Sequence, residues 1–153
     1  MIFNRVQKLS LENTLCGDKG CRLLSEALLY NNSLIMLNLS KCNLSDILAS
    51  SIADFIESNF SISILILHWN QITGDGCSLI ASKLEDNRHM QIFDASYNSF
   101  GICSENKAAK ALRQLFLRNK LLLHVDLSGN KFHSADISLI SSCMNRGRIG
   151  QKS

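Results

Sequence analysis

A regular internal repeat constrains the fold of this chain more than any other feature of its sequence. Each copy begins with an apolar residue, and three steps of 28 followed by one of 32 connect Val6, Leu34, Ile62, Met90 and Leu122. The residues three and five positions further on are also apolar in every copy. A fixed period of this length indicates stacked structural units, none of which can bury a hydrophobic core without its neighbours.

Each copy combines a strand pattern with a helix pattern. Leu37 and Leu39 are two residues apart, so both side chains of a strand here point to the same side. Ile52 and Ile56 follow at helical spacing. The absence of proline is consistent with unbroken helices and strands. We therefore predict one α/β domain over residues 1–153, with a parallel sheet on one side and helices on the other.

Polar residues also recur in register. The position eight residues into the copies holds Thr14, Cys42, Asn70, Asn98 and Asn130. The asparagine amides are expected to satisfy backbone groups of neighbouring turns, and Thr14 and Cys42 are expected to do so less well. This position therefore predicts a hydrogen-bonded ladder that runs through the stack and weakens toward the first copies.

Helix boundaries carry their own periodic signals. Helix starts are predicted at Asp18, Asp46, Asp75 and Asp136, because acids favour the exposed amides of a first turn. Small hydroxyl caps are predicted at Ser45, Thr73 and Ser134. Left-handed helix ends are predicted at Asn31, Asn59, Asn87, Asn119 and Gly147, since asparagine and glycine tolerate that conformation best.

The pattern LxxLxLxxNxL, clearest in ILILHWNQI, IFDASYNSF and HVDLSGNKF, resembles the leucine-rich repeat. The period of 28 is similar to that of the ribonuclease-inhibitor-like subfamily. This resemblance implies a solenoid: a right-handed β-α superhelix, or horseshoe segment, with a parallel concave sheet and convex helices. Repeats are expected to start near residues 6, 34, 62, 90 and 122, and residues 148–153 to form a frayed tail.

The fourth repeat is four residues longer than the first three, within residues 101–111. Its helix is predicted to run from Glu105 to Arg118. A longer loop or an extra helical turn is the simpler interpretation, because insertions in repeat proteins usually map to loops. A functional lip beside the concave face is the alternative.

Composition and charge exclude several classes of protein. Apolar residues make up 46% and charged residues 19%, as in globular domains. No apolar run approaches the ~18 residues of a membrane span, and residues 1–15 lack the apolar core of a secretory signal. The net charge of +3 is too small to indicate nucleic-acid binding. We therefore predict neither a membrane nor a nucleic-acid partner.

The charge is unevenly distributed along the chain. Residues 1–100 hold seven basic and ten acidic residues, whereas residues 101–153 hold nine and three. A solvated helix face is the simpler interpretation of this basic end, and an acidic partner is the alternative.

No motif in the sequence indicates catalysis. The six cysteines show neither zinc-site nor paired spacing, which predicts reduced thiols in the cytoplasm. No phosphate-binding loop or hydrolase motif occurs, and the four histidines are scattered. We therefore expect no enzyme activity, no cofactor and no metal site.

The strand register places one set of side chains on the concave face. Trp69, the only tryptophan, and Tyr97 are predicted to stack there, and exposed aromatic residues are enriched in binding hot spots. Solvent-facing aromatics that stiffen the sheet are the alternative. The predicted partner-binding residues are Asn38, Lys41, Ile66, His68, Trp69, Asp94, Tyr97, His124 and Asp126.

The resemblance implies a protein–protein interaction module or scaffold whose protein partner it does not identify. One alternative is a GTPase-activating or other regulatory scaffold. A second is a structural component of a larger assembly, for example ciliary or cytoskeletal. Neither end shows a capping segment, and uncovered sheet edges pair readily, so a homo-oligomer or larger assembly through the ends is also expected.

Overall fold

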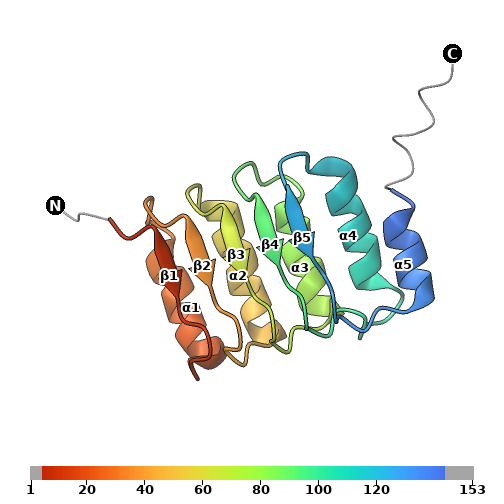
Figure 1. The fold of residues 1–153 in the computed structure, drawn as a ribbon, viewed down its shortest axis with the longest axis horizontal. Helices are drawn as coiled ribbons and strands as arrows, with labels where there is room; N and C mark the ends of the chain where they lie inside the picture. The colour runs from red at the N-terminus through yellow and green to blue at the C-terminus, as the bar shows by residue number, and fades with distance from the viewer. Residues whose placement is uncertain (1–4, 144–153) are drawn as a thin grey trace, which may run out of the picture.

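Residues 5–143 of the chain are described by the computed structural model, so the predicted frayed tail and the predicted helix end at Gly147 lie outside the described residues. Five strand–helix units follow one another (Figure 1). Their elements are β1 (Lys8–Ser10), α1 (Gly17–Leu28), β2 (Met36–Asn38), α2 (Asp46–Ser58), β3 (Ile64–Ile66), α3 (Gly74–Leu84), β4 (Ile92–Asp94), α4 (Lys107–Arg118), β5 (His124–Asp126) and α5 (Ser134–Ser141).

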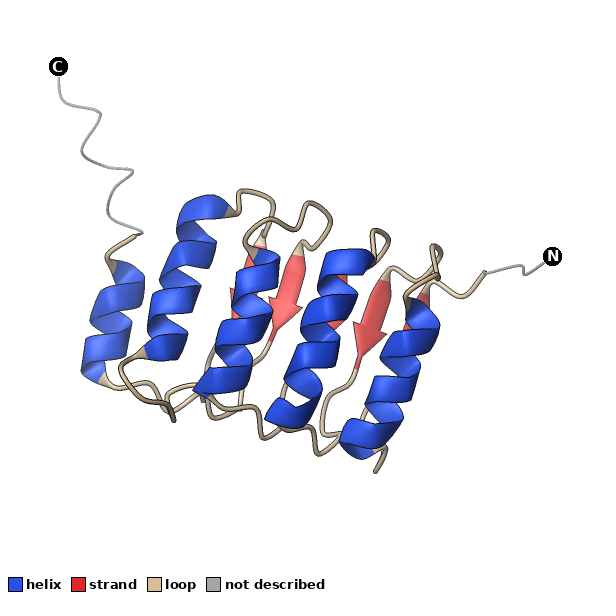
Figure 2. Ribbon diagram, turned by 180° about the vertical axis from the view of Figure 1, so that it is seen from behind, coloured by secondary structure: helices blue, strands red, loops and turns tan. Residues whose placement is uncertain are grey.

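The strands form one parallel sheet in the order β1-β2-β3-β4-β5. The central residues of the strands pair in the predicted register, Leu9 with Leu37, Leu37 with Leu65, Leu65 with Phe93, and Phe93 with Val125. All five helices cover the same face of this sheet, as Figure 2 shows from the helical side. No helix of residues 5–143 lies on the opposite face, which is the concave face of the solenoid. The predicted solenoid architecture is therefore confirmed.

The hydrophobic core lies between the sheet and the helices. In the third unit the side chains of Leu65, Leu67 and Leu84 are completely buried. The two outer units bury the equivalent positions only partly: Leu11 in the first unit and Leu127 in the last pack against the core at intermediate exposure. Each unit therefore depends on neighbours on both sides for full burial.

The asparagine ladder is present as predicted. The Asn70 Oδ1 atom accepts the backbone N–H groups of Cys42 and Leu44, at 3.1 and 3.0 Å. Its Nδ2 atom donates to the carbonyl oxygens of Leu39 and Leu67, at 3.0 and 2.8 Å. Nearer the N-terminus, the Cys42 sulfur makes weak contacts with the carbonyl oxygens of Leu11 and Ser40, at 3.1 and 3.4 Å, so the ladder is weaker there as expected.

The predicted N-terminal helix caps are confirmed in two units and wrong in a third. Ser45 and Thr73 cap α2 and α3 as predicted. Asp18, in the first turn of α1, additionally accepts the backbone N–H of Ser45 at 2.8 Å, so it links one unit to the next. Ser134 does not cap α5, because it is the first helical residue and His133 precedes it as the cap.

The predicted left-handed helix ends at the four asparagines are wrong. Asn59 and Asn119 are extended, with φ of −96° and −76°, and neither Asn31 nor Asn87 has a positive φ. Asn59 instead accepts the backbone N–H of Ile62 through Oδ1 at 3.0 Å and donates through Nδ2 to the Leu28 carbonyl at 3.0 Å. Asn59, Asn87 and Asn119 form a second ladder, which joins the ends of α2, α3 and α4 to the preceding unit.

The longer fourth repeat forms a loop before its helix. Glu105 and Asn106 both have a φ of 54°, so the helix begins at Lys107 and not at the predicted Glu105. The predicted end of the helix at Arg118 is confirmed.

Candidate functional site

The most exposed aromatic side chains of the concave face form one stacked pair. The ring centroids of Trp69 and Tyr97 lie 4.4 Å apart with an interplanar angle of 5°. Their side chains remain 53% and 48% exposed. We call Trp69 and Tyr97 the aromatic pair; the prediction that they stack is confirmed.

The aromatic pair occupies a strained backbone position. One residue in every unit, directly before the ladder position, has a positive φ between 52° and 68°: Asn13, Lys41, Trp69, Tyr97 and Gly129. Glycine and asparagine adopt this left-handed conformation readily, whereas bulky residues are outliers there, at about 1–2 kcal/mol each. An offset aromatic stack contributes about 0.5–1.5 kcal/mol. The stack therefore offsets only part of the cost of two bulky residues at this position.

Gly129 completes one side of the aromatic pair. A Cβ atom at this glycine would lie 2.7 Å from Cδ1 of the Tyr97 ring. The missing side chain thus leaves room for the ring to lie over the backbone of the last unit. Tyr97 is thereby held between Trp69 and Gly129, which fixes the orientation of the aromatic pair.

Two of the predicted site carboxylates are engaged in local turns. Asp94 accepts the backbone N–H of Ser96 at 3.0 Å, and Asp126 accepts that of Ser128 at 2.9 Å. The backbone hydrogen bond from Ser128 is the main cause that lowers the pKa of Asp126, and His124 and His68 add a smaller effect through their charge. Both carboxylates therefore shape the ends of their strands while presenting negative charge to the concave face.

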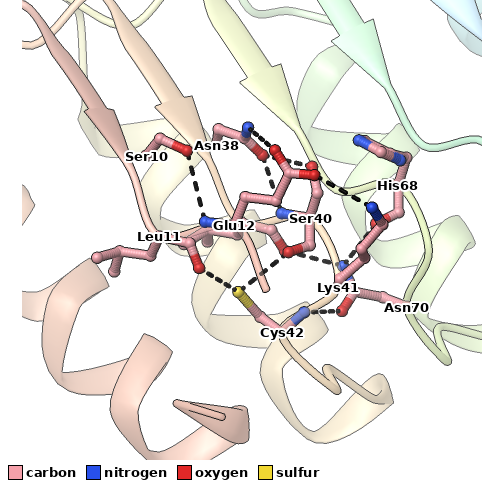
Figure 3. A network of polar contacts seen from close by, with 10 residues as sticks. Ser10, Leu11, Glu12, Asn38, Ser40, Lys41, Cys42, His68 and Asn70 are labelled. Carbon is pink, nitrogen blue, oxygen red and sulfur yellow. Dashed lines mark hydrogen bonds and ion pairs between the residues drawn. The ribbon is translucent and has the colours of Figure 1, made fainter. Parts of the chain in front are cut away.

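A polar network covers the N-terminal part of the concave face (Figure 3). Glu12 forms an ion pair with Lys41 at 3.3 Å and accepts a hydrogen bond from Nδ2 of Asn38 at 3.4 Å. Asn38 is buried and also accepts the backbone N–H of Ser40 at 3.0 Å. Of the predicted site residues, Asn38 and Lys41 thus already make polar contacts within the protein.

A row of apolar side chains lies on the same face, and the sequence analysis identified only one of its members, Ile66. Met36, Ile64 and Ile92 pair across β2, β3 and β4, and Ile66 lies two residues beyond Ile64 on the same face. All four are partly exposed. We call them the apolar row. The available signal was the run ILIL at residues 64–67, in which every residue is apolar although only alternate ones point into the core.

The two predicted histidines lie at opposite ends of their strands. His124 continues the line of the apolar row, since it pairs with Ile92. His68 directly precedes Trp69 and is half-buried. The aromatic pair follows the apolar row by five residues along each strand, at most about 16 Å. A partner with an ordinary contact area of about 800 Å² covers both features.

Three further features of residues 5–143 bear on what the surface can bind. Within residues 5–143, no three or more His, Cys, Asp or Glu side chains gather as metal ligands would. No helix in that range combines the length and apolarity needed to span a bilayer. All six cysteines are free thiols, although the structure brings the sulfur atoms of Cys16 and Cys21 to 3.2 Å, which their spacing did not suggest. Burial raises the pKa of Cys21.

Architecture, register and asparagine ladder together define a leucine-rich-repeat solenoid. A family model described as "Leucine Rich repeat" matches residues 58–81. The protein "NACHT, LRR and PYD domains-containing protein 14" is 28% identical over 138 residues in Mus musculus and 27% identical over 157 residues in Homo sapiens. These alignments cover 90% and 100% of the chain, which spans only 14% of each relative's length.

Two solved structures share the fold. "Leiomodin-1 Actin-Binding Site 2 (ABS2)" matches with a TM-score of 0.73 and 22% identity, over 93% of this chain and 83% of that one. The tropomodulin C-terminal domain of Caenorhabditis elegans matches with a TM-score of 0.77 and 17% identity, over 94% and 85%.

Proposed function

We propose that this chain is a protein-interaction module that binds a protein partner through its concave face, with no catalysis of its own. The aromatic pair carries the proposal. Trp69 and Tyr97 stand where the backbone has positive φ, and their stacking offsets only part of the cost of placing bulky residues there. A strained conformation that a protein keeps although it lowers stability points to a functional role. Exposed Trp and Tyr side chains also dominate many binding hot spots.

The chemistry of the face indicates the kind of contact. The apolar row supplies half-buried area that a partner can cover, at about 25 cal/mol per Å² of apolar surface. The carboxylates of Asp94 and Asp126 lie beside it, so basic side chains on the partner complement this end. The site residues predicted from the sequence, extended by the apolar row, form the proposed interface.

Replacing both Trp69 and Tyr97 by alanine is expected to weaken capture of the partner from native extract at least tenfold. The fold should persist, because alanine keeps the same backbone strain and only the stack is lost, about 0.5–1.5 kcal/mol. The measurement is a quantitative pull-down on the immobilised chain, with thermal unfolding monitored in parallel.

Leu79→Ala is the matched control. Leu79 lies on α3, on the helical side, and is 46% exposed, close to the exposure of the aromatic pair. Capture should be unchanged by this substitution. If the double variant captured as much partner as the unmodified chain, the concave face would not be the binding surface.

A cytoskeletal assembly component is the second candidate. Two observations favour it: the likeness to Leiomodin-1 Actin-Binding Site 2, and the partly exposed core residues Leu11 and Leu127 in the two outer units. Actin co-sedimentation with the same aromatic variants tests this candidate. A cytoplasmic location and membership of the ribonuclease-inhibitor-like subfamily belong to the same proposal, supported by the free thiols and the repeat period.

A further inference from the structure

We infer that a groove beside α4 is a second binding site, which takes an acidic segment of a partner protein. The groove has a volume of about 620 Å³. We call it the α4 groove; α4 lies between α3 and α5 on the helical side of the molecule (Figure 2), away from the concave face. Its lining residues are Ser78, Ser104, Glu105, Lys107, Lys110, Ala111, Arg113, Gln114 and Leu139.

The longer fourth repeat shapes one end of the α4 groove. Glu105 and Asn106, both with positive φ, turn the loop before α4, and Ser104 and Glu105 form part of the lining. The inserted residues thus contribute to a surface on the helical side, where the sequence had suggested either a plain loop or a lip beside the concave face. The groove therefore belongs to the one unit that departs from the regular repeat period.

Three cations face the α4 groove against a single carboxylate. Lys107 is held by Asp75 at 2.6 Å, and the Arg113 Nε atom donates to the Ser142 hydroxyl at 3.1 Å. Among residues 5–143, neither Lys110 nor Arg113 forms an ion pair with a carboxylate. These two side chains therefore have charge available for a ligand, and the Arg113 guanidinium suits a carboxylate in particular.

A second groove on the same side shows that this charge is not a general property of the helices. It has a volume of about 400 Å³ and is lined by residues of α2, α3 and the following loop. The formal charges of its lining cancel, with Glu57 and Asp86 against Lys83 and Arg88. Lys83 and Glu57 also form an ion pair at 2.6 Å. Of these two grooves, only the α4 groove has a lining with a net positive formal charge.

The lining favours a protein segment over the other anionic or internal occupants. Residues 144–153 contain three basic residues and no acidic one, so the chain's own C-terminal segment has the wrong charge. Nucleic-acid sites combine a long basic track with aromatic stacking, whereas no aromatic residue lines this groove. Ala111 and Leu139 add apolar surface to the same lining. The lining fits a short segment with two or more Asp or Glu residues around one aliphatic side chain.

Fluorescence anisotropy with a labelled acidic peptide, Glu-Glu-Leu-Asp-Glu, tests the inference on the purified full chain at low salt. Binding is expected to weaken at least tenfold in a variant carrying both Lys110→Glu and Arg113→Glu. It should also weaken as salt rises, since exposed charges are screened. Should the reversed charges disturb the fold, the neutral pair Lys110→Gln and Arg113→Gln is expected to give a smaller loss in the same direction.

Lys83→Glu with Arg88→Glu, in the charge-balanced groove, is the matched control and should leave peptide binding unchanged. The Trp69→Ala and Tyr97→Ala variants should also bind the peptide normally, which separates this site from the concave face. Equal affinity of the peptide for the unmodified chain and the Lys110/Arg113 variants would overturn the inference. Tighter binding of a single-stranded oligonucleotide than of the peptide would overturn it as well.

Discussion

Replacing Phe93 by alanine is expected to lower the free energy of unfolding by about 3–5 kcal/mol. Phe93 is the central residue of β4, is 2% exposed, and pairs in register with Leu65 and Val125. Its removal leaves a cavity at the junction of three units. Because each unit is stabilised mainly by its neighbours, this loss should weaken the stack on both sides. Chemical denaturation measures the effect.

Phe60→Ala serves as the control for this prediction. Phe60 is 70% exposed and makes an edge contact with His89, with ring centroids 5.4 Å apart. Its loss should cost less than about 1 kcal/mol, as for most exposed side chains. Similar destabilisation by both substitutions would contradict the placement of the core between sheet and helices.

Replacing Asn70 by alanine is expected to destabilise the chain by about 2–4 kcal/mol, although the substitution removes little apolar surface. The side chain is 8% exposed and serves five backbone groups: the N–H groups of Cys42 and Leu44 and the carbonyl groups of Leu39, Leu67 and His68. Each buried polar group left without a partner costs about 1–3 kcal/mol. Thermal unfolding followed by circular dichroism provides the measurement.

The exposed Asn32 provides the comparison for Asn70. Asn32→Ala should change stability by less than about 0.5 kcal/mol. If Asn70→Ala were as mild as Asn32→Ala, the ladder would not hold neighbouring units together.

Hydrophobic periodicity was sufficient to predict the strands, their register and the inward face of the helices. Leu9, Leu37, Leu65, Phe93 and Val125 pair as their spacing requires. The prediction succeeded because alternate residues of a strand point to the same face. A register shift of one residue would therefore move the buried apolar side chains to the solvent face. Repetition in five copies reinforced the signal.

Side-chain hydrogen bonding between units could not be predicted in the same way. Asparagine suits a left-handed helix end, but it equally suits a turn in which its side chain accepts backbone N–H groups. Asn59 and Asn119 adopt the second arrangement. Their Nδ2 atoms donate to the carbonyl oxygens of Leu28 and Leu84 in the preceding units, at 3.0 and 2.6 Å. That choice depends on the neighbouring unit, which a single residue's preference does not describe.

The left-handed position of the concave face was also hidden from sequence reasoning. Asn13, Lys41, Trp69, Tyr97 and Gly129 share this conformation but no side-chain property. The aromatic pair could be anticipated from register alone, since Trp69 and Tyr97 stand at the same place in successive repeats. The strained backbone conformation of the pair could not be anticipated from the sequence. Apart from Ile66, the apolar row was overlooked because apolar residues at core and surface positions look alike in sequence.

Acrylamide quenching of the single tryptophan tests the central claim most directly, because Trp69 reports on the concave face without any label. The account places this side chain 53% exposed in a stack with Tyr97, on the outside of an in-register sheet. It predicts fluorescence that acrylamide quenches readily, quenching that increases in Tyr97→Ala, and protection when the partner is bound. Emission that resists acrylamide in the free folded chain would show a tryptophan buried in the interior and would contradict the account.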